Sequence, residues 1–486
     1  MNNLLVKKNL KSEYHKLVDL KRQEALHDHC GIFGIYAPGE DVAKITYFAL
    51  HSLQHRGQES AGMAVSDGRK LRGIRNLGLV TSVFNEKNLS KLKGFIAIGH
   101  NRYSTTGSNT KDNIQPVILA SKHKVFSLAH NGNVINAKML NSQFKHMKRS
   151  ASSDSEVITQ AIYRAPGSKW REKIMNAAPH FIGAYSIIAC SKKRMYAFRD
   201  PWGIRPLCLG RLKGYYVLAS ETCAFDTIGA LFERDIKPGE IIEIYKNKIN
   251  ILGYIDNLGK KPSFCLFEYV YLARPDSILN NMLVHEARKK SGQILAKEAP
   301  VKADLVAAIP DSGTSAAIGY ASALGIPFGE VMIKNRYIGR TFIQPEQHVR
   351  ELGVKIKFNP MKQILEGKKI VIVDDSIVRG TTIKKIVEIL KKNGAKEIHI
   401  RICSPPVKFP CYFGVDTPNK KNLIASEMRV KKIKKFIKAD SLHYLSLSGL
   451  VEASGQGKNS LCTACFSGRY PIKIDTHFNK HILEDS

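Results

Sequence analysis

The stretch KKIVIVDDSIVRGTTIKKIVEILKKNGA, residues 368–395, limits the fold more than any other part of the sequence. A short apolar run ends in two aspartates, a short loop follows, and a helix with apolar residues on one face comes next. The same alternation surrounds it, with strands expected at 304–310, 369–375 and 397–404 and helices at 282–298, 313–324, 382–393 and 430–437. Nearly continuous apolar strands alternating with helices predict a parallel sheet covered by helices, which is an α/β fold.

The chain before this region has a different rhythm. Short β-rich runs such as CGIFGIYA, FIAIGHNRYS and GAYSIIAC alternate with turn residues, and helical patterns interrupt them near 40–54 and 154–177. This pattern predicts an α+β domain of packed antiparallel sheets with helices. The rhythm changes near 253–265, so we assign residues 30–252 to a first domain and 253–486 to a second.

Composition narrows the classes of function. The formal net charge is +33, and the run MRVKKIKKFIK lies at 428–438. Lysines are spread along every segment, which is typical of a solvated surface, so we expect no nucleic-acid partner; the positive field suits a strongly anionic small substrate. No window reaches the roughly 18 apolar residues of a membrane span, so we expect no membrane contact. Nine irregularly spaced cysteines without a secretory signal favour a cytoplasmic protein.

Asp374 and Asp375 end the apolar strand, at the edge of a parallel sheet where ligands bind. The loop after them brings N–H groups and hydroxyls to a helix N-terminus, a phosphate-binding arrangement. The segment resembles the loop of type I phosphoribosyltransferases that binds 5-phosphoribosyl 1-pyrophosphate (PRPP). The resemblance implies that the carboxylates face the ribose hydroxyls and help bind one Mg²⁺ per subunit, while the loop wraps the 5-phosphate. The implied PRPP-binding residues are Asp374, Asp375, Ser376, Arg379, Gly380, Thr381 and Thr382.

Two further segments fit the same resemblance. AAIPDSGTSAA, residues 307–317, follows another expected strand and resembles the loop that meets the pyrophosphate, which makes Ser312 a further Mg²⁺ ligand. KNRYIGRTFIQ, residues 334–344, resembles the mobile loop that closes over PRPP. Its cations would neutralise the phosphates, and they are Lys334, Arg336 and Arg340.

A single cysteine, Cys30, opens the first β run in DHCGIFGIY. HSLQHRGQESAGMAV, GHNRYSTTG, AHNGNVINA and SSDSEV follow in order, each with polar side chains beside glycines or at the ends of β runs. Together they resemble the class II glutamine amidotransferases over residues 30–250. The resemblance implies that Cys30 is the nucleophile, Arg102 holds the glutamine carboxylate, and Asp154 holds its ammonium group. Asn131 and Gly132 would form the oxyanion hole.

The chemistry of amide hydrolysis explains the position of Cys30. The thiol needs a base, and an α-amine with a pKa of about 7.7–8.0 suits that role. Cys30 has a free α-amine only after residues 1–29 are removed. We therefore expect residues 1–29 to be a propeptide.

Four cysteines at distant positions form a further set. CTAC contains Cys462 and Cys465, and Cys265 and Cys411 would complete four thiolates, with Cys403 as a competitor for Cys411. Spacing alone leaves zinc and iron–sulfur open. The contexts resemble the iron–sulfur subgroup of glutamine PRPP amidotransferases, which implies one [4Fe–4S] cluster per subunit. The remaining cysteines are expected in the core: Cys190, Cys208 and Cys223.

The order of parts resembles the glutamine PRPP amidotransferases along nearly the whole chain. Glutamine, PRPP and water would give 5-phosphoribosylamine, glutamate and pyrophosphate, the first committed step of purine synthesis. The resemblance implies feedback inhibition by purine nucleotides, a homotetramer, and a closed path for ammonia completed by the 336–350 loop. Two alternatives are a class II amidotransferase with another acceptor and a nucleic-acid-binding regulator with a phosphoribosyltransferase fold.

Overall fold

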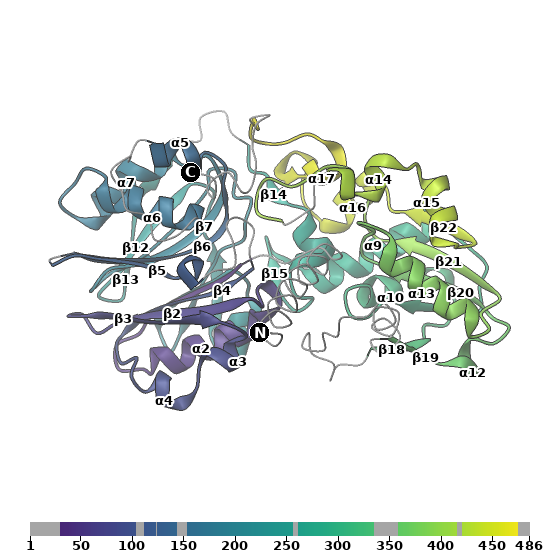
Figure 1. Ribbon diagram of the computed structural model, residues 1–486, viewed down its shortest axis with the longest axis horizontal. Coiled ribbons are helices and arrows are strands. Elements are labelled where there is room, and N and C mark those ends of the chain that lie inside the picture. The colour runs from purple at the N-terminus through teal and green to yellow at the C-terminus, as the bar shows by residue number, and fades with distance from the viewer. Residues whose placement is uncertain are drawn as a thin grey trace, which may run out of the picture.

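The chain folds into two halves that lie side by side (Figure 1). The computed structural model describes residues 30–103, 111–122, 124–142, 153–255, 261–334, 358–415 and 420–474. The expected propeptide 1–29 lies outside these residues. No helix in the described part of the chain is long and apolar enough to cross a membrane.

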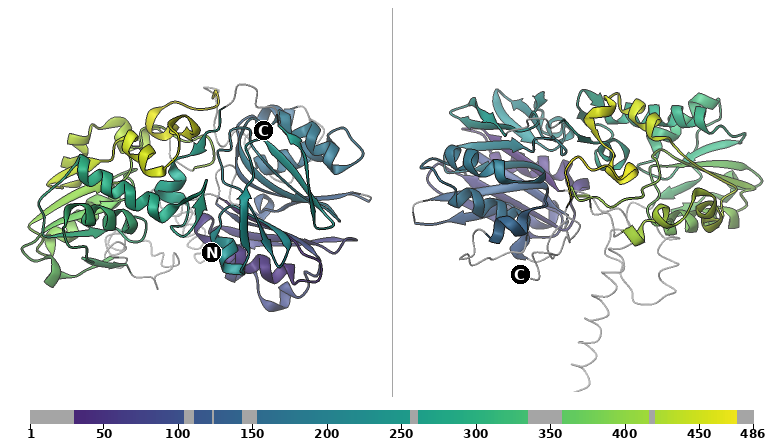
Figure 2. Two further views of the ribbon diagram at one scale, coloured as in Figure 1. Left: turned by 180° about the vertical axis from the view of Figure 1, so that it is seen from behind. Right: turned by 90° about the horizontal axis from the view of Figure 1, so that it is seen from above.

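The N-terminal half contains two antiparallel sheets that face each other (Figure 2). The first has seven strands in the order β11 (Leu231–Asp235), β9 (Cys208–Leu212), β10 (Tyr215–Ala219), β1 (Gly31–Tyr36), β4 (Ile96–Arg102), β2 (Ser60–Ser66) and β3 (Leu71–Leu77). The second has six, in the order β13 (Lys248–Tyr254), β12 (Glu240–Tyr245), β8 (Met195–Arg199), β7 (Gly183–Cys190), β6 (Val125–Val134) and β5 (Val117–Ala120). The last strand, β13, runs past the predicted domain boundary at 252.

Helices cover the outer faces of both sheets. Those on the side of the first sheet are α2 (Val42–Ser52), α3 (Val80–Val83), α4 (Glu86–Leu89) and α8 (Cys223–Ile228). Those on the side of the second are α5 (Ala137–Ser142), α6 (Asp154–Arg164) and α7 (Trp170–Ala177). The helical pattern expected over 154–177 is therefore two helices, because Pro166 and Gly167 interrupt it.

Strand β1 shows why this half reads as continuous apolar runs. Phe33 and Ile35 point to the core shared with α2, whereas Ile32 and Tyr36 point to the core between the two sheets. Both faces of the strand are buried, so no polar alternation is left in the sequence. Cys30 directly precedes this buried strand.

The C-terminal half is built on a parallel sheet, as the sequence predicts. Its order is β17 (Leu305–Ala308), β20 (Lys369–Asp374), β21 (Glu397–Ile402) and β22 (Ser441–Tyr444). Alternate residues of β20 enter two cores, with Val371 and Val373 in one and Ile370 and Ile372 in the other. The principal helices are α9 (Val284–Glu298), α10 (Thr314–Leu324), α13 (Thr381–Lys392), α15 (Val430–Ile437) and α16 (Leu447–Ser454).

Small elements fill the side of this half that faces the N-terminal half (Figure 1). Strand β14 (Phe264–Cys265) pairs in parallel with β23 (Leu461–Cys462), which precedes α17 (Ala464–Ser467). A π-helix, Glu268–Leu272, follows β14. β15 (Ile278–Leu279) lies on the same side, next to the N-terminal half, and is paired with β16 (Met282–Leu283) (Figure 1). Short elements elsewhere in the C-terminal half include β18 (Met332–Lys334), β19 (Phe358–Pro360), α12 (Lys362–Leu365) and α14 (Ile424–Glu427).

Candidate active sites

Cys30 lies buried at the head of β1, with 6% of its surface exposed. Its Sγ donates a hydrogen bond to the carbonyl of Tyr103 at 3.5 Å. Burial raises the pKa of the thiol to about 11, partly offset by that hydrogen bond and by the charge of Arg102. A thiol in such surroundings stays protonated at neutral pH, so attack on an amide requires a base beside it.

The predicted glutamine-binding residues gather around this thiol. Arg102 ends β4, and its positive charge favours the thiolate, while the negative charge of Asp154 at the start of α6 opposes it. Asp154 Oδ2 accepts a hydrogen bond from the Val134 N–H at 3.0 Å. Arg102 and Asp154 are both buried, so a small ligand between them would meet one cation and one anion away from bulk water.

Asn131 and Gly132 lie next to each other in β6, in the second sheet. Asn131 is fully buried, yet neither its Nδ2 nor its Oδ1 has a hydrogen-bond partner among the described residues. Gly132 has φ +147°, and a Cβ there would lie 2.0 Å from the Ala184 carbonyl oxygen, so only glycine fits. A buried polar group without a partner is costly, which indicates that the Asn131 amide serves a ligand.

The predicted phosphate loop joins β20 to α13. Asp374 ends β20, and Gly380 precedes α13 with φ +77°, a conformation that favours glycine. Thr381 and Thr382 form the first turn of the helix, where N–H groups point outward. The Ser376 hydroxyl donates to Asp375 Oδ1 at 2.5 Å. The loop therefore has the position and the groups of an anion site.

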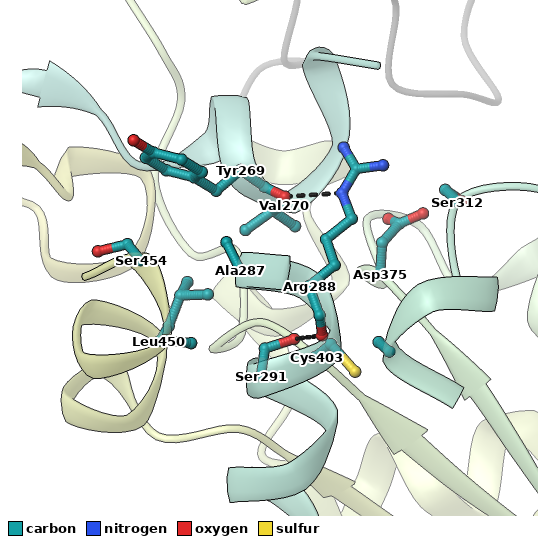
Figure 3. Close-up of a pocket in the computed structure, with 12 residues that line it drawn as sticks. Tyr269, Val270, Ala287, Arg288, Ser291, Ser312, Asp375, Cys403, Leu450 and Ser454 are labelled. Carbon is teal, nitrogen blue, oxygen red and sulfur yellow. Dashed lines mark hydrogen bonds between the residues drawn. The ribbon is translucent and has the colours of Figure 1, made fainter. Parts of the chain in front are cut away.

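The two loops of this half meet beside Asp375 (Figure 3). Ser312, in the loop between β17 and α10, lines the same cavity as Asp375 and lowers the pKa of the Asp375 carboxyl. A Cβ at Gly313 would lie 2.6 Å from the Val373 carbonyl oxygen, so the loops pack closely. Burial raises the pKa values of Asp374 and Asp375, and the negative charge of Asp375 raises that of Asp374 further. Two adjacent carboxylates, one of them buried, are stabilised by a cation.

The predicted cations of the closing loop are only partly described. Lys334 ends β18, and its Nζ lies 2.7 Å from Asp311 Oδ2. Arg336 and Arg340 lie outside the described residues, as does the whole 336–350 segment. The sequence did not predict a role for Arg288, a buried residue of α9. Its positive charge lowers the pKa of Asp375, and its Nε donates a hydrogen bond to the Tyr269 carbonyl at 2.8 Å (Figure 3).

The four predicted cluster cysteines come together from three segments. Cys265 and Cys462 are register partners of β14 and β23, and the negative charges of Cys265, Cys411 and Cys462 all raise the pKa of Cys465, second to burial. Among the described residues, no three His, Cys, Asp or Glu side chains are arranged to hold a metal ion. The donor set of four buried or partly buried thiols nevertheless suits a metal or iron–sulfur group.

The other cysteines occupy the positions expected of core residues. Cys190, Cys208 and Cys223 are almost completely buried in the N-terminal half. Cys403 follows β21 and is buried beside Ser291 and Asp375, where burial raises its pKa. The electrostatic neighbours of Cys403 do not include the four gathered cysteines.

A buried chain of ion pairs joins the two halves, and sequence reasoning missed it. Arg56 donates to Glu221 Oε1 at 3.0 Å and to Glu268 Oε2 at 2.6 Å, and Arg205 donates to Glu268 Oε1 at 3.1 Å. All four side chains are at most 1% exposed. The HRGQ segment contains Arg56, but its partner Glu268 lies 212 residues away, so no local pattern could reveal the pair.

The N-terminal half has two antiparallel sheets with a cysteine at the head of one strand, which defines a glutamine amidotransferase. The C-terminal half has a parallel sheet in which one strand ends in two aspartates and leads into a phosphate loop, which defines a phosphoribosyltransferase. Comparisons with known families agree. Residues 100–227 match the glutamine amidotransferase domain, and residues 276–404 match the phosphoribosyl transferase domain.

Relatives that align with nearly the whole chain identify the particular family. The amidophosphoribosyltransferase of Synechococcus elongatus is 47% identical over 472 residues, which cover 96% of this chain and 95% of that protein. A structure of the Bacillus subtilis glutamine PRPP amidotransferase with ADP and GMP is 43% identical, with a TM-score of 0.88, and covers 93% of this chain and all of that one. A second structure, of the allosteric regulatory enzyme of purine biosynthesis, is 44% identical, also with a TM-score of 0.88, and covers 93% of this chain and 99% of that one.

The chain belongs to the amidophosphoribosyltransferase family. It is a glycosyltransferase that uses glutamine as the nitrogen donor and PRPP as the acceptor, and its reaction is the first step of purine biosynthesis. The predicted fold class is confirmed. The alternatives with another acceptor or with nucleic-acid binding receive no support from these relatives.

Proposed function

We propose that Cys30 is the nucleophile of the glutaminase half-reaction and that its own α-amine is the base. Sγ attacks the side-chain amide carbon of glutamine, and the thiol proton passes to the α-amine. The α-amine then gives this proton to the leaving nitrogen, and ammonia departs as the C–N bond breaks. Water then hydrolyses the thioester to release glutamate. The raised pKa of the buried thiol supports this assignment, because such a thiol needs a base. The α-amine requires that residues 1–29 be removed as a propeptide.

The remaining glutamine-site roles follow from charge and hydrogen-bonding capacity. Arg102 would hold the α-carboxylate of glutamine and Asp154 its α-ammonium group. The Asn131 Nδ2 and the Gly132 N–H would donate to the oxyanion of the tetrahedral intermediate. The buried amide of Asn131, which has no hydrogen-bond partner among the described residues, is the observation that carries this proposal, because an oxyanion bound beside it would supply a partner.

In the C-terminal half, we propose that the Asp374–Thr382 loop binds PRPP. Asp374, Asp375 and Ser312 would hold one Mg²⁺, which supplies positive charge to the departing pyrophosphate. Ser376, Arg379, Gly380, Thr381 and Thr382 would surround the 5-phosphate. The cations Lys334, Arg336 and Arg340 would neutralise the pyrophosphate. Ammonia then attacks C1, the C1–O bond breaks, and 5-phosphoribosylamine forms.

We also propose that Cys265, Cys411, Cys462 and Cys465 hold one [4Fe–4S] cluster. Their common location and the chemistry of four thiolates support it. A bound cluster would tie three distant chain segments together, and no step of the reaction needs an electron. Iron and sulfide analysis of anaerobically purified protein tests this assignment, and stoichiometric zinc without sulfide would refute it.

We propose regulation from a relative's bound nucleotides, and assembly from the family resemblance alone. The Bacillus subtilis structure contains ADP and GMP, which supports feedback inhibition of this chain by purine nucleotides. A homotetramer and a cytoplasmic location complete the proposal, the latter because Cys30 and the four gathered cysteines work as reduced thiols. We place the domain division between Tyr254 and Phe264, since β13 ends at Tyr254 and β14 begins at Phe264.

A pair of variants tests the two half-reactions separately. Cys30→Ala should abolish glutamine-dependent synthesis while ammonia-dependent synthesis continues, because PRPP chemistry does not use the thiol. Asp374→Asn should lower synthesis from either nitrogen source and raise the KM for PRPP. Loss of ammonia-dependent synthesis in Cys30→Ala would mean that Cys30 serves folding, and intact mass must place the mature N-terminus at Cys30.

A further inference from the structure

A short segment of the C-terminal half, Tyr412–Gly414, lies directly against the strand that carries Asn131 and Gly132. The Asn133 Nδ2 donates to the Tyr412 carbonyl at 2.8 Å. A Cβ at Gly414 would lie 3.1–3.3 Å from the C, Cα and O atoms of Gly132. The two backbones therefore touch at the glycine whose N–H is assigned to the oxyanion.

Arg205 fixes the same segment from within the N-terminal half. Its Nε and Nη2 donate to the Phe413 carbonyl at 2.9 and 2.8 Å, and its Nη1 donates to Glu268 at 3.1 Å. Arg205 is fully buried, so these bonds are shielded from water and hold a planar group in one orientation. At the head of the segment, the Phe413 N–H donates to the Cys411 Sγ at 3.4 Å.

The backbone of Arg205 also reaches the oxyanion strand. Its carbonyl accepts from the Ser186 hydroxyl at 3.1 Å, and Ser186 is the register partner of Asn131 across β6 and β7. Gly132 has no spare room in this arrangement, because the Ala184 carbonyl and Gly414 both pack against its backbone. Contacts from both halves thus determine where the Asn131 amide and the Gly132 N–H lie.

We propose that Tyr412–Gly414, held by Arg205, is a positioning element for the glutaminase oxyanion hole. The inference rests on the proposed roles of Asn131 and Gly132. None of the segment's residues touches glutamine in this proposal; they act through Gly132 and Asn133. Oxyanion donors stabilise the transition state only when their positions are held tightly, so a small displacement lowers kcat and leaves ground-state binding nearly unchanged.

Gly414→Ala is the sharpest test, because it places a methyl group against Gly132. We expect the glutaminase kcat to fall at least ~10-fold, part of the roughly 10²–10³-fold cost of losing an oxyanion donor. The KM for glutamine should stay within about twofold, because Arg102 and Asp154 are not displaced. Ammonia-dependent synthesis should be unchanged. Equal kcat in variant and parent would overturn the proposal, as would an equal loss of both activities.

A matched control separates contact from backbone strain. Gly414 has φ +104° and Gly367 has φ +75°, but a Cβ at Gly367 would meet nothing within 4 Å. Gly367→Ala therefore introduces comparable left-handed strain without a contact, and both activities should match the parent. Arg205→Lys is a second variant, which keeps the charge beside Glu268 but loses the paired bonds to Phe413. It should also lower glutaminase kcat selectively.

The experiment distinguishes this inference from the oxyanion assignment itself. Asn131→Ala should lower the glutaminase kcat by roughly 10²–10³-fold if Asn131 is an oxyanion donor. A large effect of Asn131→Ala with no effect of Gly414→Ala or Arg205→Lys sinks only the positioning role. Full activity of Asn131→Ala sinks the oxyanion assignment and the inference together.

Discussion

At the scale of single residues, two buried histidines make the N-terminal half sensitive to acid. His100 in β4 bonds through Nε2 to the His130 carbonyl at 3.1 Å. Burial and the nearby charge of Arg102 lower the pKa of His100 to about 3, and burial also lowers that of His130. Both imidazoles are therefore neutral in the folded chain at neutral pH, whereas the unfolded chain protonates them near pH 6.5.

This difference makes the free energy of unfolding depend on pH. Between pH 6.5 and 3 the unfolded chain binds a proton at residue 100 that the folded chain does not, so the free energy of unfolding falls on acidification. One such histidine contributes up to about 1.4 kcal/mol per pH unit. We expect His100→Gln to reduce this slope by about one proton, measured by urea denaturation from pH 7 to 5. An unchanged slope would show that His100 is protonated in the folded chain.

The site residues predicted from the sequence share a local signal, and the contacts that were not predicted lack one. Asp374 and Asp375 follow an apolar strand, and Cys30 precedes one, so each is recognisable from its own neighbours. Arg288 is a plain helix residue in sequence, and its relation to Asp375 appears only after α9 packs. The same holds for Gly414, whose importance depends on Gly132, hundreds of positions earlier in the chain.

At the scale of elements, a strong periodicity of apolar residues predicts a helix or strand well, and a weak one does not. The helix expected at 382–393 is α13, Thr381–Lys392, because its apolar residues recur on one buried face. Strand β22, Ser441–Tyr444, was not predicted, since Leu442 is its only buried residue. It becomes a strand by pairing with β21, a long-range interaction that its own four residues do not encode.

Helix α13 also offers a stability prediction. Ile386 is 1% exposed within the core under the parallel sheet. Ile386→Ala should lower the free energy of unfolding by about 2–5 kcal/mol, because it removes buried methyl groups and leaves a cavity. Lys392→Ala, at an exposed position of the same helix, should cost less than about 1 kcal/mol. Denaturant unfolding of both variants checks this, and equal midpoints would contradict the assigned burial.

At the scale of the whole molecule, the two halves are joined by charge as well as by packing. Glu268 lies in the π-helix after β14 and accepts hydrogen bonds from Arg56 and Arg205 of the other half. Charges removed from water are tolerated only while they remain paired. The Arg205 side chain also reaches Phe413, two positions from Cys411, so the same buried chain connects the glutaminase strands with the cysteine region.

Glu268→Gln tests how strongly this chain of ion pairs holds the halves together. The neutral amide would leave Arg56 with Glu221 alone and Arg205 without a carboxylate, so we expect the free energy of unfolding to fall by about 3–5 kcal/mol. Glu40→Gln is the matched control, because Glu40 pairs with Lys213 at 3.0 Å on the exposed surface and should matter by less than about 1 kcal/mol. Calorimetry of the holoenzyme should show a lower temperature for the first unfolding transition only in Glu268→Gln, because its two halves then unfold separately. Identical thermograms for the two variants would mean that apolar packing alone joins the halves.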